Sequence, residues 1–267
     1  MCESVVLSIG WENPEQTYKD LIQVLERNNF ILTDKKHDIH SVNSIKFMSD
    51  IIGAEGWVLD ILKSGVKIDF NQCLPTTYQE PNNQSAVKEM EFLHSKVQSW
   101  IDDGFVQLKD TKLLYVNPMS VVVKQDLLSN KIKKHPVIEM SHCINKKLVK
   151  KSFNMDNFIS EPSIRKEDFQ IIFDLENMYF HFKLAPEHRP YFSFSLPDQN
   201  DGHSFYECKV MCYGYSLTAY IVTRVIVPIK HKLGIRFHIY IDDGRILGQS
   251  KSECHFKVKF AVHIFQL

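Results

Sequence analysis

Three aspartates in the sequence have the residue type and the order needed for chemistry on phosphate groups. Asp242 and Asp243 follow the apolar stretch "IRFHIYI", and Asp174 ends a second apolar stretch, "FQIIFD". If these stretches are neighbouring strands, the carboxylates converge and raise one another's pKa unless a cation neutralises them. Hard divalent cations suit such oxygen ligands, and two magnesium ions support in-line phosphoryl transfer. Because this pattern also arises by chance, an unrelated two-metal phosphoesterase stays open at this point.

The tetrapeptide Ile-Asp-Asp-Gly occurs twice, and its first copy has a different context. The preceding segment "SAVKEMEFLHSKVQSWIDDGF" predicts a helix with Ser85 as its N-cap. One face of that helix would carry Val87, Met90, Leu93, Val97 and Ile101. Gly104 follows where a helix needs a residue able to adopt the left-handed conformation. Asp102 and Asp103 would therefore be solvated residues of the last turn, without a metal.

The segments that must position the second Ile-Asp-Asp-Gly copy are predicted to be several strands and one helix. Residues 169–174 predict a strand, residues 191–196 and 204–210 a hairpin, and residues 216–234 a helix that Pro228 should kink or shorten. Residues 235–241 and 245–250 predict two strands. Asp243-Gly244 is a strong signal for the tight turn between them.

Upstream, the sequence predicts a helix over residues 14–29 and strands over residues 119–124 and 135–141, joined by a basic turn over residues 130–135. Residues 30–55 are polar and carry no usable motif. Seven lysines fall between Lys131 and Lys151 against one acid, Glu139. This cluster predicts either a phosphate-binding patch or a solvated lysine-rich loop.

The composition limits the class of protein. The 267 residues are 44% hydrophobic and 24% charged, as in a globular chain long enough to bury a sizeable core. Lysine plus arginine equal aspartate plus glutamate, at 32 each, so no global basic excess points to nucleic acid. The six cysteines form no CxxC pair, which favours reduced thiols in an intracellular protein. Neither a signal peptide nor a membrane-length apolar run is expected.

Two long stretches, "FDLENMYFHFKLAPEHRPYFSFSL" and "YGYSLTAYIVTRVIVPIKHKLGIRFHIYIDDGRI", resemble the palm of a retrotransposon reverse transcriptase. With "GWVLDILKSGVKIDF" upstream, the resemblance covers about residues 56–250 and is of the DIRS-like or LTR type. It implies an α+β fold, a fingers-and-palm polymerase module whose antiparallel palm sheet is backed by helices. The implied regions are an N-terminal segment (1–55), a lead-in and fingers-like region (56–150) and a palm-like region (151–267), truncated after the Tyr-x-Asp-Asp motif and without a thumb.

The resemblance also implies a role for individual residues. Two Mg²⁺ ions, or Mn²⁺ in their place, would be held by the catalytic residues Asp174, Asp242 and Asp243. The implied nucleotide-binding residues are Tyr179, Lys124, His135, Gly214 and Ser216. The implied primer and template contacts are Tyr240, Lys131, Lys133 and Lys134.

The implied activity is RNA-directed DNA synthesis, in which a primer 3′-hydroxyl attacks the α-phosphate of a deoxynucleotide and pyrophosphate leaves. The partners would be an RNA or DNA template–primer and the deoxynucleotide, and no membrane. His135 stands where the family has an arginine, so a permanently charged clamp is lost. This departure and the missing thumb favour the alternative, an inactive relic that at most binds nucleic acid or a protein.

Overall fold

The computed structural model describes residues 11–27, 30, 38–125, 132–152, 164–175, 177–198, 202–233, 235–240 and 243–265. The chain forms two compact units, each assembled from separated segments. Unit 1 comprises Met1–Lys63, Ser152–Met178 and Ala219–Leu267. Unit 2 comprises Ser64–Lys151 and Tyr179–Thr218. The three sequence regions given above stay a prediction, because they name functional parts and not compact units.

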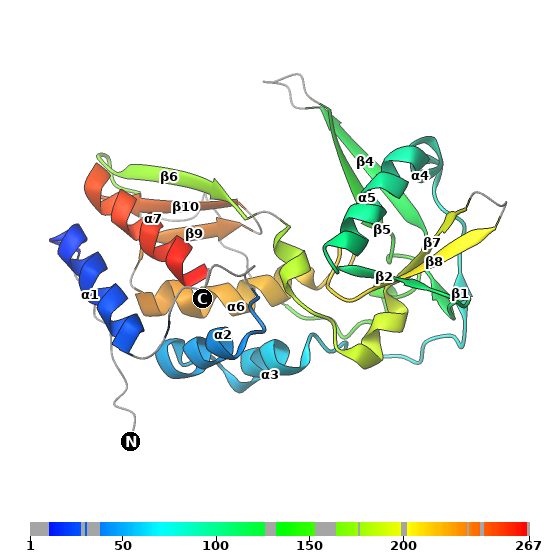
Figure 1. Ribbon diagram of the computed structural model, residues 1–267, viewed down its shortest axis with the longest axis horizontal. Coiled ribbons are helices and arrows are strands. Elements are labelled where there is room, and N and C mark those ends of the chain that lie inside the picture. The colour runs from blue at the N-terminus through cyan, green and yellow to red at the C-terminus, as the bar shows by residue number, and fades with distance from the viewer. Residues whose placement is uncertain are drawn as a thin grey trace. The chain divides into compact units, whose positions relative to one another are not determined.

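Unit 1 combines helices with one three-stranded antiparallel sheet. Its strands lie side by side in the order β6 (Phe169–Asp174), β10 (Asp243–Gly248) and β9 (Phe237–Tyr240) (Figure 1). The helices are α1 (Pro14–Arg27), α2 (Val42–Phe47), a π-helical turn (Met48–Ile52), α3 (Gly56–Ser64), α6 (Thr218–Leu233) and α7 (Lys251–Phe265). Helix α7 packs against β6 and β10, and α1 lies beside α7, where the rings of Tyr18 and Phe256 are 5.7 Å apart. The α+β class is thus confirmed.

The apolar residues of β6 and β10 determine which side of this sheet is buried. Ile246 is fully buried and lies opposite Ile171, and Gly244 lies opposite Phe173. A Cβ atom at position 244 would collide with the Phe173 ring, so only glycine allows the two strands to pair with that ring in place. Ile172 is exposed on the other side. The alternation of strand side chains therefore fixes the register of β6 against β10.

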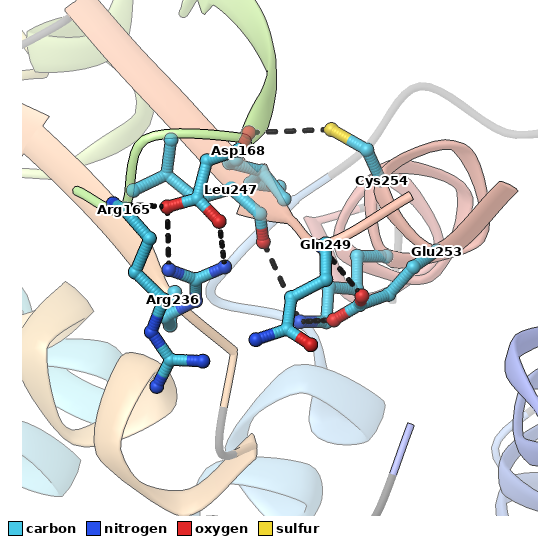
Figure 2. A network of polar contacts seen from close by, with 9 residues as sticks. Arg165, Asp168, Arg236, Leu247, Gln249, Glu253 and Cys254 are labelled. Atoms are coloured by element: carbon cyan, nitrogen blue, oxygen red, sulfur yellow. Dashed lines mark hydrogen bonds and ion pairs between the residues drawn. The ribbon is translucent and has the colours of Figure 1, made fainter. Parts of the chain in front are cut away.

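An ion pair joins the two outer strands at their starts. Asp168 precedes β6 and Arg236 precedes β9, and the guanidinium donates two hydrogen bonds of 2.7 and 2.6 Å to the carboxylate (Figure 2). The side chain of Asp168 is 2% exposed and that of Arg236 is 22% exposed. The Arg165 amide also donates to Asp168, at 2.7 Å. Hydrogen bonding from Arg236 lowers the pKa of the Asp168 carboxyl below its usual range.

Helix α7 is attached to the same end of the sheet by its own polar contacts. Glu253 accepts hydrogen bonds from the Gln249 amide at 2.7 Å and from Lys257 at 2.5 Å (Figure 2). Lys257 also donates to the Leu247 carbonyl at 3.4 Å, and the Cys254 thiol donates to the Ile246 carbonyl at 3.3 Å. These contacts tie the end of β10 to the helix that follows it.

The described residues of unit 2 form three small sheets and two α-helices. A three-stranded sheet has the order β2-β8-β7, a hairpin is formed by β4 and β5, and β1 pairs in parallel with β3. Buried Leu93, Met119, Leu184, Phe192 and Phe194 contribute to its core. The strands are β1 (Tyr78–Gln79), β2 (Val106–Lys109), β3 (Tyr115–Val116), β4 (Met119–Gln125), β5 (Ile132–Ile138), β7 (Ser193–Pro197) and β8 (His203–Cys208). The helices are α4 (Gln84–Lys88) and α5 (Met90–Asp102), with 3-10 turns at Asn145–Lys147, Met178–His181 (which begins in unit 1) and Pro186–Tyr191.

Several sequence predictions are confirmed by these elements. The first helix, the strand ending at Asp174, both hairpins and the strands on either side of the basic turn are all present. Gly104 has φ 77°, the left-handed conformation expected after the helix, and Asp102 and Asp103 are exposed. Among the residues that the structure describes, none of the helices combines the length and apolar character needed to cross a lipid bilayer.

Other predictions about local structure were wrong. Asn83, not Ser85, is the N-cap of α4, because the Ser85 hydroxyl accepts a hydrogen bond from the Val121 amide instead. Val87 is 51% exposed, since the break at Glu89 between α4 and α5 shifts the buried face. Of the two effects expected of Pro228, a kink or a shorter helix, the shorter helix does not occur, because α6 continues to Leu233.

Two further features of the structure differ from the sequence predictions. Asp243 and Gly244 belong to β10 and pair with Tyr240 and Ile239, so the strand pairing begins immediately after positions 241 and 242, which lie outside the described residues. The polar stretch before residue 56 contains α2 and the π-helical turn, in which Phe47, Met48, Ile51 and Ile52 are buried.

We expect Asp168→Asn to lower the free energy of unfolding by about 2–3 kcal/mol, because it removes the anion from a largely buried bidentate pair. Since the folded-state pKa is lowered, the wild-type contribution is present above the unfolded-state value of about 3.9 and is lost as pH falls through the lower folded-state value. Urea unfolding between pH 3 and 7 measures both effects. Glu15→Gln, which removes the exposed Lys19–Glu15 pair, is the control and should change little. Equal effects of the two variants would contradict the prediction.

Candidate active site

Two of the three sequence-predicted carboxylates lie directly opposite each other in the sheet of unit 1. Asp174 is the last residue of β6 and Asp243 is the first of β10, and the two are register partners. Residues directly opposite in an antiparallel pair point to the same side, with Cα atoms about 4.5–5.5 Å apart. Both residues are exposed. The sheet thus presents two carboxylates together at one end.

The remaining sequence-predicted members of this group are only partly described. Asp242 lies outside the described residues. Tyr240 is the last residue of β9 and is the register partner of Asp243, so the three strands bring Asp174, Asp243 and Tyr240 into one row. No group of three or more histidine, cysteine, aspartate or glutamate side chains with metal-binding spacing occurs among the described residues.

The donor chemistry at this end of the sheet suits a divalent cation. Carboxylate oxygens are the hard ligands that Mg²⁺ and Mn²⁺ prefer, and Mg²⁺ typically keeps several waters while binding one or two carboxylates. Like charges directly opposite each other across a strand pair are destabilising unless a cation lies between them. Asp174 and Asp243 therefore fit such an ion both in ligand type and in placement.

A second group of sequence-predicted residues lies on one side of the β4–β5 hairpin in unit 2. Lys124 is the register partner of Lys133, and Val122 is that of His135. Because alternate residues of a strand point to the same side, Lys124, Lys133 and His135 share one face of the hairpin. Both lysines are exposed. We call this surface the cationic face.

Lys134 lies on the opposite face of the hairpin, as strand alternation requires. Its ammonium is 2.6 Å from the Glu89 carboxylate and 5.7 Å from the centre of the Phe92 ring. Lys133 and Lys134 are strand residues, so the basic turn predicted over residues 130–135 was placed too far along the chain. Lys131 lies outside the described residues.

Two further lysines of the predicted cluster, Lys147 and Lys151, contact backbone and side-chain groups of unit 2. Lys147 donates to the Cys73 carbonyl at 3.0 Å, and Lys151 lies 3.3 Å from Asp69. Both lysines thus contact the same segment of unit 2, residues 69–73. The cationic face is the part of the cluster that the strand register brings together.

The Gly214–Ser216 loop packs against the end of β5. Gly214 has φ 109°, and a Cβ atom there would collide with the Ile138 carbonyl oxygen and meet Val137 at 3.3 Å. The Ile138 amide donates to the Tyr213 carbonyl at 3.1 Å. Only glycine permits this approach, which explains the residue type at position 214.

The side chains around this loop divide into a buried and an exposed set. Tyr215 is buried against Phe192, with ring centres 5.2 Å apart, and burial raises the pKa of its phenol. Ser216 is exposed. Tyr179 lies beside this loop, because its ring centre is 4.9 Å from that of Tyr213, the residue before Gly214. The sequence-predicted residues Tyr179, Gly214 and Ser216 are thereby brought together within unit 2.

One residue of this region was missed from the sequence. Asn145 donates a hydrogen bond to the Gly214 carbonyl at 2.7 Å and accepts one from the Ser216 amide at 3.1 Å. It lies in the part of the chain that resembles a reverse transcriptase, but no role was predicted for it, because an asparagine gives no periodic signal. Only the folded contact reveals it.

A comparison with protein-family models supplies the decisive observation. The model described as reverse transcriptase (RNA-dependent DNA polymerase) matches residues 122–265, which is more than half of the chain. The chain belongs to the reverse transcriptase family. A search of curated proteins found no match.

The matched range of this reverse transcriptase begins in β4 and ends in α7. It therefore includes Asp174, Tyr179, the Gly214–Ser216 loop, the aspartate pair and the cationic face. Family membership supports nucleotidyl transfer in general, with a nucleic-acid template–primer and a nucleotide as partners and divalent metal ions as the usual cofactor. The confirmed resemblance is to the family, and it extends past residue 250 through α7.

We expect Gly214→Ala to lower the free energy of unfolding by about 3 kcal/mol, because it combines a left-handed backbone conformation with a collision against the Ile138 carbonyl. Gly104→Ala is a matched control in the same unit, with φ 77° and only the flexible Lys209 ammonium at 3.9 Å, and should cost about 1 kcal/mol. Urea unfolding curves of the two variants measure the difference. Equal losses would show that the approach of the loop to β5 contributes nothing.

Proposed function

We propose that this protein is a retroelement-derived polymerase of the DIRS-like or LTR type that extends a DNA primer on an RNA or DNA template. The observation that carries the proposal is the cross-strand placement of Asp174 and Asp243 within a chain of the reverse transcriptase family. The reaction forms a bond between the primer 3′-oxygen and the α-phosphorus of a deoxynucleotide. The bond to pyrophosphate breaks, and pyrophosphate leaves.

Asp174, Asp242 and Asp243 would hold two divalent cations, with Mg²⁺ as the expected ion. When bound, such ions stabilise the entering and leaving oxygens of an in-line phosphoryl transfer. The contribution of the protein is rigid placement of the ligands. Asp174 and Asp243 are the ends of paired strands, so their separation is set by the sheet and not by loop motion.

The residues of unit 2 support the binding half of the proposal. Lys124, Lys133 and His135 on the cationic face would meet phosphate groups, since two ammonium groups directly opposite each other favour a shared anion. Tyr179 would lie under the incoming sugar, and the Gly214–Ser216 loop would lie against the template and the new base pair. Lys131, outside the described residues, would meet the template. Tyr240, which belongs to unit 1, would lie near the primer end.

Lys134 is left out of the phosphate contact. Its ammonium is engaged by Glu89 and lies on the other face of the hairpin. The proposed fingers-like part therefore uses two consecutive residues of one strand for two tasks. Lys133 serves the ligand and Lys134 attaches the hairpin to α4 and α5.

A second candidate function is a nucleic-acid-binding module without polymerase activity. The observation that favours it is His135, which occupies the place of a family arginine on the cationic face. Imidazole cannot form the two parallel hydrogen bonds that guanidinium offers to phosphate. Such a module would bind template–primer and would extend no primer.

We expect Asp174→Asn and Asp243→Asn each to reduce the rate of primer extension on an RNA template at least about a hundredfold, because each removes an anionic ligand at the reacting centre. The control is the other copy of the same tetrapeptide, since Asp102→Asn and Asp103→Asn alter exposed residues at a helix end and should leave the rate within about twofold. Gel-resolved extension in Mg²⁺ measures both pairs. Wild-type rates in Asp174→Asn would overturn the polymerase proposal, and binding without extension by wild type would favour the module.

We expect Lys133→Ala to weaken binding of an RNA–DNA template–primer about two- to fivefold and to reduce the slope of log affinity against log salt by about 1, because one phosphate contact is lost. Lys134→Ala, which changes the neighbouring lysine on the other face, should leave that slope unchanged. Fluorescence anisotropy titrations from 50 to 200 mM salt measure both. A larger loss of slope in Lys134→Ala would show that the assignment of faces is wrong.

A further inference from the structure

The Gly214–Ser216 loop is fastened by a single amide side chain from a distant part of the sequence. Asn145 Nδ2 donates to the Gly214 carbonyl at 2.7 Å, and Asn145 Oδ1 accepts from the Ser216 amide at 3.1 Å. The two contacts bridge positions 214 and 216 as a neighbouring strand would. They also define the amide orientation, because the reverse orientation would set oxygen against oxygen and nitrogen against nitrogen.

The position of Asn145 is itself fixed by the backbone. It begins the 3-10 turn Asn145–Lys147, and its own amide donates to the Met140 carbonyl at 2.9 Å. Met140 and Ile144 are fully buried, so the segment that carries Asn145 is anchored in the core of unit 2. The Asn145 side chain therefore contacts the loop from a backbone position that the core of unit 2 fixes.

The other hydrogen bonds of the loop hold the carbonyls of Tyr213 and Tyr215, and not the groups that Asn145 contacts. On one side the Ile138 amide holds the Tyr213 carbonyl, and on the other the Thr218 hydroxyl donates to the Tyr215 carbonyl at 2.8 Å. Tyr215 points into the core, whereas Ser216 is exposed. Asn145 holds the Gly214 carbonyl, which lies between those two carbonyls, and the Ser216 amide, which shares a peptide group with the Tyr215 carbonyl.

We propose that Asn145 is a positioning residue for the nucleotide and template site, acting through the Gly214–Ser216 loop. The inference rests on the proposed function, because that loop is taken to lie against the nascent base pair. The two hydrogen bonds of Asn145 fix the positions of the Gly214 carbonyl and the Ser216 backbone. Loss of Asn145 therefore weakens binding of the incoming nucleotide, whereas the carboxylates in unit 1 keep their own geometry. The effect falls on KM for the nucleotide and leaves kcat nearly unchanged.

Two substitutions separate the two hydrogen bonds. Asn145→Ala removes both. Asn145→Asp keeps an acceptor for the Ser216 amide and removes the donor to the Gly214 carbonyl, which then faces a carboxylate oxygen. Asn82→Ala is the matched control in the same unit, since Asn82 donates to the Ser195 carbonyl at 2.9 Å and accepts from the Met119 amide at 2.8 Å, away from the loop.

The experiment combines hydrogen exchange on the full chain with steady-state primer extension. In Asn145→Ala, the Ser216 amide should exchange about three- to tenfold faster, because it loses its acceptor. In Asn145→Asp, Ser216 protection should persist. Both variants should raise KM for the nucleotide about three- to tenfold with kcat within about twofold, and Asn82→Ala should change neither Ser216 exchange nor KM.

The exchange and kinetic results test different claims. If wild type extends no primer, the proposed polymerase function fails, and Ser216 exchange still decides whether Asn145 holds the loop. Unchanged Ser216 exchange in Asn145→Ala overturns the inference regardless of activity. A KM change no larger than that of Asn82→Ala, in an active enzyme, overturns it as well, because the effect would then be general loss of stability.

Discussion

The bidentate pair between Arg236 and Asp168 is the interaction on which the sheet of unit 1 depends. It joins the start of β6 to the start of β9, the two strands that flank β10 and do not pair with each other. A slip of one residue would turn every side chain of a strand to the other face of the sheet. By fixing both outer strands at one end, the pair helps to ensure that Asp174 meets Asp243 at the other.

Alternation along strands also explains how unit 2 assigns neighbouring lysines to different tasks. On β5, Lys133 faces Lys124 across the hairpin, and Lys134 one residue later reaches Glu89 on the opposite side. The first arrangement leaves two positive charges together, which favours an anionic ligand. The second gives a partly buried ion pair beside the Phe92 ring, which attaches the hairpin to the helices. Two neighbouring lysines of the predicted cluster thus lie on opposite faces of the hairpin.

Patterns with a period or a turn signature could be predicted from the sequence, because backbone geometry enforces them locally. Gly104 after an amphipathic helix and Asp174 at the end of an apolar strand are of this kind. Ser85 was misjudged because its hydroxyl is used by β4, and Asp243-Gly244 because pairing with β6 extends the strand into the expected turn. The contacts of Asn145 could not be predicted, since its partners lie about 70 residues away and no local rule marks an amide that bridges two backbone groups.

The two ends of the unit 1 sheet differ in a way that relates stability to function. At one end, Asp168, Arg236, Glu253 and Lys257 satisfy one another and neighbouring backbone groups. At the other, Asp174 and Asp243 place like charges opposite each other, which a fold selected for stability alone would avoid. Two carboxylates stay opposite each other as long as the strands that carry them stay in register. The ion pairs at the first end therefore help to hold Asp174 and Asp243 opposite each other at the second. The repulsion between these two carboxylates marks the place where a cation would be bound.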